Sequence, residues 1–354
     1  MFEVGTVVNP LTFITGHVRP IYESVILKYP YRLNAMAIDP SKIHVNSEYI
    51  YEPGEVVFSL DMYRTIRVTA RKDNRIVVSG NIDRVQLVSH AVGLMKYALN
   101  VKTGFAVEVV SDREYKHAGF GSSSSLIAGV AAAINELYGN PIPREVLVTY
   151  LAQNHGEEIE GDFDHLRHVQ CIGGGAAAGL LSAGALILAG QSQCISKAYI
   201  SNEYTVIIGI PKDYIPKDAQ ELMDLELSHM DNFIQTGTTY GPVIAYDMLH
   251  DVLPEMMHNK IEALGKLIYK YRFEYGSIKN CSFLYPPMVA IAERIKNIYL
   301  SGWADVLSLS SVGPAFFVIT KYPEECRKVF ESSDMSIIST CINNDGYKVL
   351  ERKL

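Results

Sequence analysis

The stretch from His117 to Leu126 holds the residue types best suited to binding an anion. It contains two glycines, Gly119 and Gly121, followed by four serines, Ser122, Ser123, Ser124 and Ser125. Glycine lets a backbone approach a ligand closely. The apolar, alanine-rich pattern over 126–137 predicts a helix directly after the serines, and the free amides and dipole of a helix N-terminus attract negative charge. The stretch therefore predicts a phosphate-binding loop.

A capped helix without a ligand is the alternative interpretation of this stretch, because serine is a common N-cap residue. One hydroxyl is enough for a cap, so the three further serines favour ligand binding. The pattern is not a Walker loop, which requires lysine after the last glycine, nor a Rossmann fingerprint, which requires a third glycine in register.

A second cluster runs from Gly156 to His168, where five carboxylates and two histidines fall within thirteen residues. Oxygen ligands suit Mg²⁺, so Glu157, Glu158 and Asp162 are the candidate metal ligands. An acidic, solvated turn is the commoner meaning of such a cluster. A zinc site that includes Cys171 ranks below magnesium, because the spacing matches no familiar zinc pattern.

Four basic residues are candidates for holding a phosphate or a substrate carboxylate: Arg32, Arg167, Lys212 and Lys217. Arg32 shares one side of a predicted strand with Asn34, because side chains alternate along a strand. Arginine offers two parallel donors to an oxyanion, whereas lysine acts as a point charge. For each of the four, a solvated surface charge is the alternative.

Composition narrows the class of protein. The chain has 354 residues, of which 48% are hydrophobic, and a net charge of −7, so we expect one large or two ordinary domains and no nucleic-acid partner. Five scattered cysteines without a Cys-x-x-Cys pair indicate reduced thiols and a cytoplasmic protein. We expect no signal peptide, and no membrane span because glycines interrupt the most apolar run, 171–189.

The order of predicted elements is mixed. Strands are predicted at 24–39 in two pieces broken at Pro30, at 43–45, 56–60, 65–71, 75–79, 104–110, 185–188, 204–210 and 347–350. Helices are predicted at 84–99, 126–137, 143–160 and 323–332, and helical patterns dominate 219–297. Asp73-Asn74 predicts a hairpin turn between the strands at 65–71 and 75–79.

The serine loop and a later turn, Ser310-Ser311-Val312-Gly313-Pro314-Ala315, resemble the second and third motifs of the GHMP superfamily of small-molecule kinases. The resemblance implies a two-domain α+β fold with the ligand cleft between the domains. We expect an N-terminal extension at 1–24, an N-terminal domain at 25–190 and a C-terminal domain at 191–354. In this arrangement Ser310, Ser311 and Gly313 shape the cleft from the C-terminal domain.

A closer resemblance is to a non-kinase branch, beta-ribofuranosylaminobenzene 5'-phosphate synthase and the related C-glycoside synthases. It is carried by Pro30-Tyr31-Arg32-Leu33 with Asp39, by 165–173, and by four of the six residues of the late motif. Asn34, Val312 and Ala315 depart from that branch, which suggests a different aromatic acceptor or a divergent subgroup. Many of the kinases place an aspartate base before a small-residue helix, and the nearest position here is Ala176.

The resemblance implies a Mg²⁺-dependent reaction of phosphoribosyl pyrophosphate with an aromatic carboxylate, in which pyrophosphate and CO₂ are lost. His165, His168 and Arg167 are the candidate catalytic residues, with structural histidines as the alternative. An ATP-dependent small-molecule kinase and a non-enzymatic nucleotide-binding module are the competing hypotheses. A homodimer is a further expectation, with the first 24 residues available to reach a partner.

Overall fold

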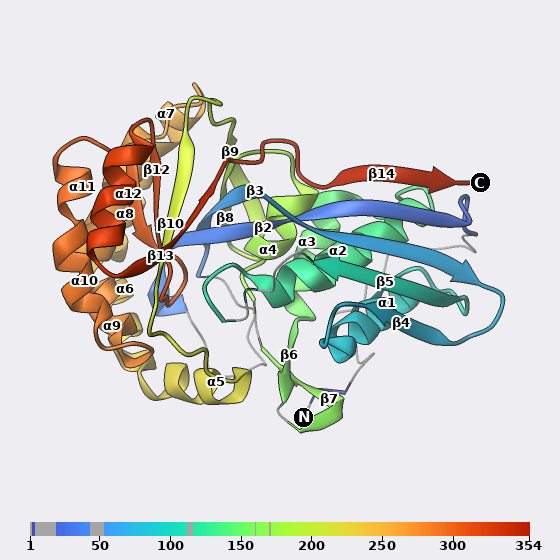
Figure 1. Ribbon diagram of the computed structural model, residues 1–354. Helices are drawn as coiled ribbons and strands as arrows, with labels where there is room; N and C mark the ends of the chain where they lie inside the picture. The colour runs from blue at the N-terminus through green and yellow to red at the C-terminus, as the bar shows by residue number, and fades with distance from the viewer. Residues whose placement is uncertain are drawn as a thin grey trace.

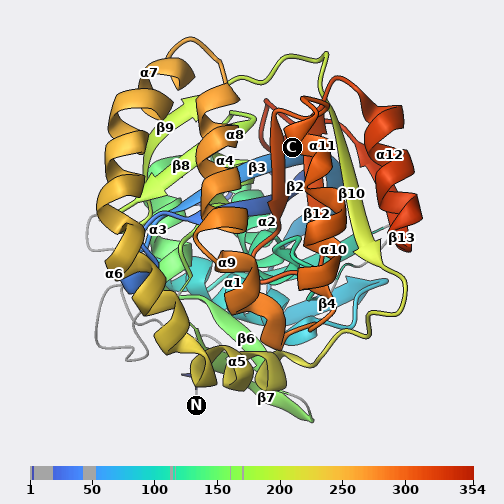
Figure 2. The same cartoon turned by 90° about the vertical axis from the view of Figure 1, so that its left-hand side faces the viewer.

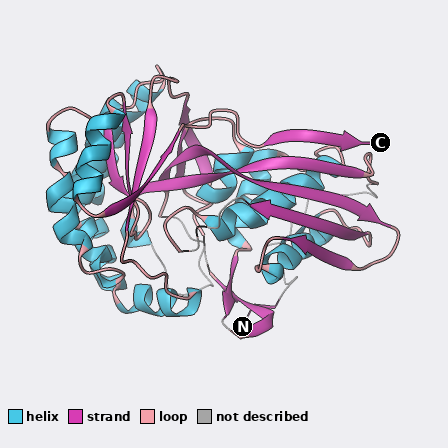
Figure 3. Cartoon of the chain, in the orientation of Figure 1, coloured by secondary structure: helices cyan, strands magenta, loops and turns pink. Residues whose placement is uncertain are grey.

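The computed structural model describes residues 2–3, 19–42, 53–111, 115, 117–159, 161–169 and 171–354. These residues form two units (Figure 1). One is built on a seven-stranded sheet, and the other on a four-stranded sheet covered by helices (Figure 3). The α+β fold class that the sequence predicts is confirmed. We refer to the two parts as the N-terminal and C-terminal units.

The seven-stranded sheet has the order β14-β2-β3-β5-β4, and β8 and β9 extend it from β3. Its strands are β2 (Ser24–Ala37), β3 (Glu55–Arg71), β4 (Ile76–Gly80), β5 (Gly104–Ser111), β8 (Ala185–Ala189), β9 (Gln193–Ala198) and β14 (Lys348–Lys353). The last strand of the chain pairs antiparallel with β2. Strands β9 and β14 thus belong to the sheet of the N-terminal unit although they lie outside 25–190.

Four helices belong to this unit: α1 (Val85–Ala98), α2 (Ser122–Leu137), α3 (Arg144–Gln153) and α4 (Gly174–Leu180). Every residue of α2 except Ser124 is buried. Helix α2 contacts β2 and β3 on one side and α1 and α4 on others, so it is enclosed. A helix enclosed in this way is apolar all round, which explains its run of alanines.

The four-stranded sheet is antiparallel with the order β11-β12-β10-β13. Its strands are β10 (Thr205–Pro211), β11 (Val306–Leu309), β12 (Phe316–Thr320) and β13 (Met335–Thr340). The helices of this unit are α5 (Ala219–Ser228), α6 (Met230–Asp247), α7 (Leu253–Met256), α8 (Glu262–Tyr269), α9 (Ser277–Asn280), α10 (Met288–Ile295), α11 (Asn297–Leu300) and α12 (Pro323–Ser332). Figure 2 shows α6, α8 and α10 in the layer nearest the viewer.

Short elements complete the fold. A three-stranded sheet contains β1 (Phe2–Glu3), β7 (Asp162–His168) and β6 (Gly156–Ile159) in that order. Single turns are η1 (Pro40–Lys42), the π-helical η2 (Met248–Val252) and η3 (Lys270–Glu274), and η4 (Cys281–Phe283). In the part of the chain that the structure describes, no helix combines the length and the apolarity needed to cross a bilayer.

One hydrophobic cluster joins the two units. Buried side chains of β2 and β3, such as Leu33 and Phe58, pack with Val206 of β10 and Phe317 of β12. The rings of Phe58 and Phe317 meet edge to face at 6.0 Å. Such a shared core fixes the position of one sheet against the other.

Three predictions about the elements are wrong. Strand β2 runs through Pro30 without a break, because its register with β3 shifts at that point, where proline is tolerated. No hairpin forms at Asp73-Asn74, since β4 pairs in parallel with β5, which lies between β4 and β3. The helix predicted at 143–160 ends at Gln153, and after it 156–159 and 162–168 pair as the antiparallel strands β6 and β7.

Other predictions are confirmed. Helix α12 has the predicted bounds, and α1 lies within the predicted range of 84–99. The strand predicted at 43–45 lies outside the described residues.

Two glycines on helices provide a matched test of this packing. In α2, a Cβ added to Gly129 would lie 2.4 Å from Cδ1 of Ile66 and 2.9 Å from Cβ of Tyr29. In α6, a Cβ on Gly241 would meet its nearest atom, Oδ1 of Asp39, at 3.9 Å. We expect Gly129→Ala to lower the free energy of unfolding by about 1–3 kcal/mol through overpacking. Gly241→Ala should leave it unchanged or raise it by up to about 1 kcal/mol.

Urea unfolding followed by circular dichroism measures both effects. Equal effects of the two substitutions would contradict the close approach of α2 to β2 and β3.

Candidate functional site

Irregular pairing in β2 directs Arg32 toward the glycine-rich loop. The register between β2 and β3 shifts between Pro30 and Arg32, and such irregularities re-aim side chains next to functional sites. The backbone N–H of Arg32 donates to the carbonyl of Phe120 at 3.3 Å, and Nη1 donates to the carbonyl of Gly119 at 3.0 Å. Arg32 thus lies against the loop before α2.

Gly121 is required at the start of α2 for two reasons. Its φ of 62° lies in the left-handed region that favours glycine. A Cβ at this position would also lie 2.8 Å from Nε of Arg32. That Nε is buried and has no hydrogen-bond partner among the described residues. The guanidinium therefore covers the first turn of α2 with unused donor capacity.

The four serines of the loop differ in their surroundings. Ser122, Ser123 and Ser125 are buried, whereas Ser124 is partly exposed. The hydroxyl of Ser124 donates to the carbonyl of Gly121 at 3.2 Å, and that of Ser125 to the carbonyl of Ser122 at 3.1 Å. Both leave their acceptor lone pairs for other donors. The prediction that all four bind phosphate is not tested, but Ser124 is the most accessible of them.

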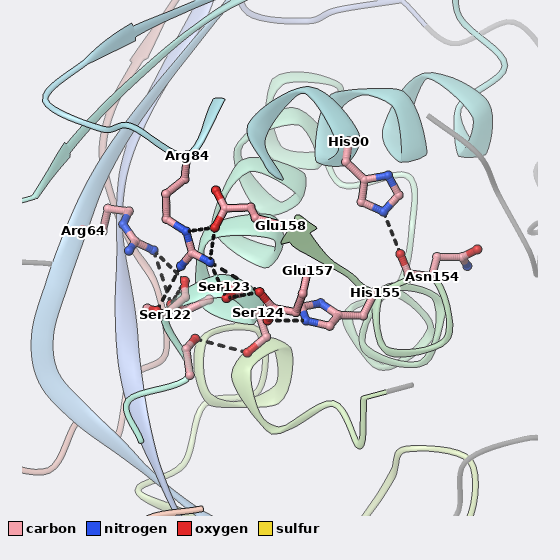
Figure 4. Close-up of polar contacts among 12 residues, drawn as sticks. Arg64, Arg84, His90, Ser122, Ser123, Ser124, Asn154, His155, Glu157 and Glu158 are labelled. Atoms are coloured by element: carbon pink, nitrogen blue, oxygen red, sulfur yellow. Dashed lines mark hydrogen bonds and ion pairs between the residues drawn. The ribbon is translucent and has the colours of Figure 1, made fainter. Parts of the chain in front are cut away.

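Arg84, directly before α1, holds the first two serines (Figure 4). The residue is fully buried, and Nη1 donates to Oγ of Ser122 at 3.0 Å while Nη2 donates to Oγ of Ser123 at 2.7 Å. Nε of Arg84 also donates to Oε2 of Glu158 at 2.7 Å, and Nη2 lies 3.4 Å from Oε2 of Glu157. Two carboxylates therefore balance the buried charge of Arg84.

Glu157 is ionised in this network. Burial alone would raise its pKa, but the hydrogen bond and charge of His155 and the charges of Arg84 and His117 outweigh burial and lower the pKa to about 2. The hydroxyl of Ser123 donates to Oε2 of Glu157 at 2.8 Å. A carboxylate and a serine oxygen are thus adjacent at the N-terminus of α2.

This pair fits Mg²⁺ better than the predicted trio does. Mg²⁺ usually binds one or two carboxylates, substrate phosphate oxygens and several waters. Among the residues that the structure describes, no three His, Cys, Asp or Glu side chains gather into a metal site. Both glutamates pair with Arg84, Glu158 at 2.7 Å and Glu157 at 3.4 Å, so Glu157 is the less closely held of the two. The carboxylate of Asp162 faces Nδ1 of His165 at 2.8 Å within the hairpin. Glu157 with Ser123 would therefore hold the ion together with a bound phosphate.

The candidate catalytic residues on β7 have structural partners. Nδ1 of His165 faces Asp162, and Arg167 forms an ion pair of 2.7 Å with Asp224 of α5. Nε2 of His168 lies 3.2 Å from the carbonyl of Gln153. Burial lowers the pKa of His168. The partners named here are not residues of the serine loop, and the catalytic roles of His165, Arg167 and His168 stay predictions.

The two candidate lysines form ion pairs on the surface. Lys212 lies 2.9 Å from Asp334, and Lys217 pairs with Glu221 one helical turn later. A different residue of the loop between these lysines contacts the candidate site. This residue is Tyr214, whose hydroxyl donates to the carbonyl of His117 at 3.2 Å.

The turn at Ser310 closes the site from the C-terminal unit. Oγ of Ser310 donates to the carbonyl of Gly119 at 2.6 Å and accepts from the backbone N–H of Asn34 at 3.1 Å. The N–H of Ser311 donates to the carbonyl of Asn34 at 2.9 Å, and Gly313 has a φ of 104°. The structure thus brings together three distant stretches that the sequence singles out: Arg32 with Asn34, the serine loop and this turn.

Three residues of the site were missed from the sequence: Glu55, Arg64 and Arg84. Glu55 is buried at the start of α4, where Oε1 accepts the N–H of Gly174 at 2.6 Å and Oε2 accepts from the amide of Asn34. Burial raises the pKa of Glu55, although Arg32 and these hydrogen bonds oppose the shift. None of the three belongs to a motif, and only the position of each beside an apolar stretch hints at burial.

Comparisons with known proteins agree with this geometry. Residues 86–170 match the family model of the GHMP kinases N terminal domain. None of the curated protein sequences matches the chain significantly.

Solved structures share the fold at low identity. A homoserine kinase from Cytophaga hutchinsonii is 15% identical, with a TM-score of 0.61 over 95% of this chain and 100% of that one. A mevalonate diphosphate decarboxylase from Staphylococcus aureus is 11% identical, with a TM-score of 0.64 over 94% and 99%. A protein described as MDDEF in complex with MVAPP, AMPPCP and magnesium is 14% identical, with a TM-score of 0.56 over 93% and 99%. The chain therefore has the GHMP-kinase fold.

The ion pairs of Arg84 and Arg167 should differ in their contribution to stability. Arg84→Met leaves two carboxylates without their buried counter-charge, so we expect it to lower the free energy of unfolding by about 3–5 kcal/mol. Arg167→Met removes a largely solvent-exposed pair with Asp224, for which we expect about 0–1 kcal/mol. Guanidinium unfolding of the two variants measures the difference, and equal losses would contradict the role of Arg84.

Buried His90 of α1 should make stability depend on pH. Nε2 of His90 lies 2.7 Å from the carbonyl of Asn154, and burial lowers its pKa to about 4. The unfolded chain, with a histidine pKa near 6.5, binds the proton more readily, so stability falls as the pH drops from about 6.5 to 4. The full difference is about 3 kcal/mol.

Thermal melts of the wild type and His90→Gln between pH 7.5 and 5 test this dependence. The variant should lose less stability on acidification than the wild type does. His258→Gln, at an exposed position, serves as the control and should retain the wild-type profile. Parallel profiles for wild type and His90→Gln would exclude His90 as the source.

Proposed function

We propose that this protein is a C-glycoside synthase. It would join the ribose 5-phosphate of phosphoribosyl pyrophosphate to an aromatic or heteroaromatic carboxylate, with loss of pyrophosphate and CO₂. The observation that carries the proposal is the glycine–serine helix start of α2 beside a second helix, α4, that carries no acidic side chain of its own. Helix α4 begins Gly-Gly-Ala, with Ala176 at the position where the kinases it resembles place an aspartate.

The surroundings of Ala176 support this proposal. A buried carboxylate at the start of α4, that of Glu55, already accepts hydrogen bonds from Gly174 and Asn34. Transfer of a phosphoryl group to a hydroxyl is helped by a group that takes the hydroxyl proton. Displacement at C1 of ribose by a ring carbon, followed by loss of CO₂ from the same carbon, releases no proton that the protein must accept. The absence of a carboxylate on α4 therefore fits the glycosyl transfer.

The start of α2 is suited to stabilise the negative charge that develops on the leaving pyrophosphate. A helix N-terminus carries free backbone amides, Ser124 is partly exposed at this end of α2, and preorganised donors stabilise developing negative charge. Mg²⁺, when held by Glu157 and Ser123, would neutralise further charge on the phosphate oxygens. Arg32, whose Nε is unpartnered among the described residues, would orient a phosphate or the acceptor carboxylate.

An ATP-dependent small-molecule kinase is the second candidate. It is favoured by the match of residues 86–170 to the GHMP kinases N terminal domain and by the magnesium and AMPPCP of the MDDEF complex. Both reactions use the same phosphate-binding helix start, so the two candidates differ in the ligand that fills it.

Calorimetric titration separates the candidates. We expect purified protein to bind phosphoribosyl pyrophosphate with Mg²⁺ at least tenfold more tightly than ATP with Mg²⁺. The double variant Ser123→Ala/Ser124→Ala should weaken that binding by at least tenfold, or about 1.4 kcal/mol. Ser332→Ala, at an exposed site on α12, is the matched control.

Preference for ATP would overturn the synthase proposal and favour the kinase. Unchanged affinity in the double variant would argue against the serine loop as the phosphate site.

A further inference from the structure

We infer that Arg272 anchors a second oxyanion of the substrate, apart from the pyrophosphate at the serine loop. The ligand would be the 5-phosphate of the ribose or the carboxylate of the acceptor. This inference rests on the proposed function. Apart from pyrophosphate, the reactants carry two further anionic groups, and Arg272 would hold one of them.

The first observation is a buried cation that has no counter-charge among the described residues. Arg272 lies in η3 and is only 3% exposed. Its Nε donates to the carbonyl of Ala35 at 2.7 Å and to Oγ of Ser308 at 3.2 Å, and Nη1 donates to Oγ of Ser277 at 3.0 Å. The nearby thiol of Cys281 stays protonated, because burial raises its pKa to about 11.

All these partners are neutral, and within the described ranges no acidic side chain forms an ion pair with Arg272. Taking a guanidinium out of water without a paired anion is costly. Arg84 of the same molecule is also buried, but its guanidinium is paired with two anions, the carboxylates of Glu157 and Glu158. Arg272 therefore has the surroundings of a group whose anion comes from a ligand.

The second observation is the position of Arg272 at the junction of the two units. Its partner Ala35 directly follows Asn34, which binds the Ser310 turn through its N–H and its carbonyl. Ala35 is an extra residue in β2, because Asn34 pairs with Val57 while Met36 pairs with Val56. A bulged residue is left out of the ladder, which frees the carbonyl of Ala35 for Arg272.

Arg272 and the serine loop therefore approach the Asn34–Ser310 contact from different elements. Ser308, its other partner, lies two residues before Ser310 on the same segment. The loop reaches this contact through the carbonyl of Gly119 and belongs to the N-terminal unit. Arg272 reaches it from the helices of the C-terminal unit. A substrate with two separated anionic groups would place one group at the serine loop and the other at Arg272.

The chemistry of the guanidinium fits a carboxylate or a phosphate. Its planar fork donates two parallel hydrogen bonds to either oxyanion, and an ammonium cannot reproduce this geometry. Arg272→Lys should therefore keep the charge and lose much of the recognition. The matched control is Arg144→Lys: Arg144 is a half-buried arginine that donates to the carbonyl of Leu180 at 3.4 Å and the hydroxyl of Tyr347 at 3.0 Å.

The test is calorimetric binding of three probes to the wild type, Arg272→Lys, Arg272→Met and Arg144→Lys. The probes are pyrophosphate with Mg²⁺, phosphoribosyl pyrophosphate with Mg²⁺, and 4-aminobenzoate. For Arg272→Lys we expect pyrophosphate affinity within twofold of the wild type. A loss of at least tenfold for phosphoribosyl pyrophosphate assigns Arg272 to the 5-phosphate, and the same loss for 4-aminobenzoate alone assigns it to the carboxylate. Arg144→Lys should bind all probes as the wild type does.

Two outcomes would overturn the role of Arg272. Wild-type affinity of Arg272→Lys for every probe would show that no ligand contacts the guanidinium. An equal loss for all three probes, pyrophosphate included, would show that Arg272 only supports the fold. If Arg272→Met does not fold, as judged by circular dichroism, Arg272→Lys decides the question. Failure of the proposed function has a separate readout: the wild-type protein would not bind phosphoribosyl pyrophosphate. In that case the role inferred for Arg272 would fall together with the proposed function.

Discussion

The guanidinium of Arg84 is the group on which the arrangement of the site depends. It is fully buried, and a buried charge is tolerated only when its partners are in place. Those partners come from two directions, the hydroxyls of Ser122 and Ser123 at the start of α2 and the carboxylates of Glu157 and Glu158 on β6. Arg84 therefore fixes the β6–β7 hairpin against the start of α2 and places Glu157 beside Ser123. Both carboxylates compensate the charge of Arg84, and Glu157 also accepts a hydrogen bond from Ser123.

Strand β2 connects this network to the rest of the molecule. Arg32 reaches the glycine loop, the backbone of Asn34 holds the Ser310 turn, and the bulged Ala35 accepts from Arg272. A regular strand would direct its carbonyls and amides only to its neighbours, so the two irregularities in register supply the free groups that these contacts need. The same strand contributes Tyr31 and Leu33 to the core shared by both units. Packing and binding are therefore coupled through fewer than ten residues of one strand.

The sequence predicts those parts of this structure that local patterns encode. The glycine–serine loop, the helix after it and α12 carry strong periodic or capping signals, and the late Ser310 motif is recognisable by resemblance. Strand order was not predictable in the same way: Asp73-Asn74 has turn chemistry, yet β4 pairs with β5 because a pairing partner is chosen by tertiary packing. Arg84, Glu55 and Arg272 carry no motif, and their importance arises only from burial, which depends on residues far away in the chain. Glu157 was a candidate metal ligand from the sequence, whereas its hydrogen bond from Ser123 is seen only in the structure.

The pairing of β14 with β2 has a consequence for biosynthesis. Ser24 lies opposite Lys353, so this edge of the N-terminal sheet has no neighbour until 348–353 have left the ribosome. Contacts between the two ends of a chain form late, because closing a long loop costs entropy before any contact compensates for it. During translation the edge of β2 is a row of unpaired amides and carbonyls that invites association with other strands. Strand β2, which organises the candidate site, is thus also a strand whose pairing must wait until 348–353 have been synthesised.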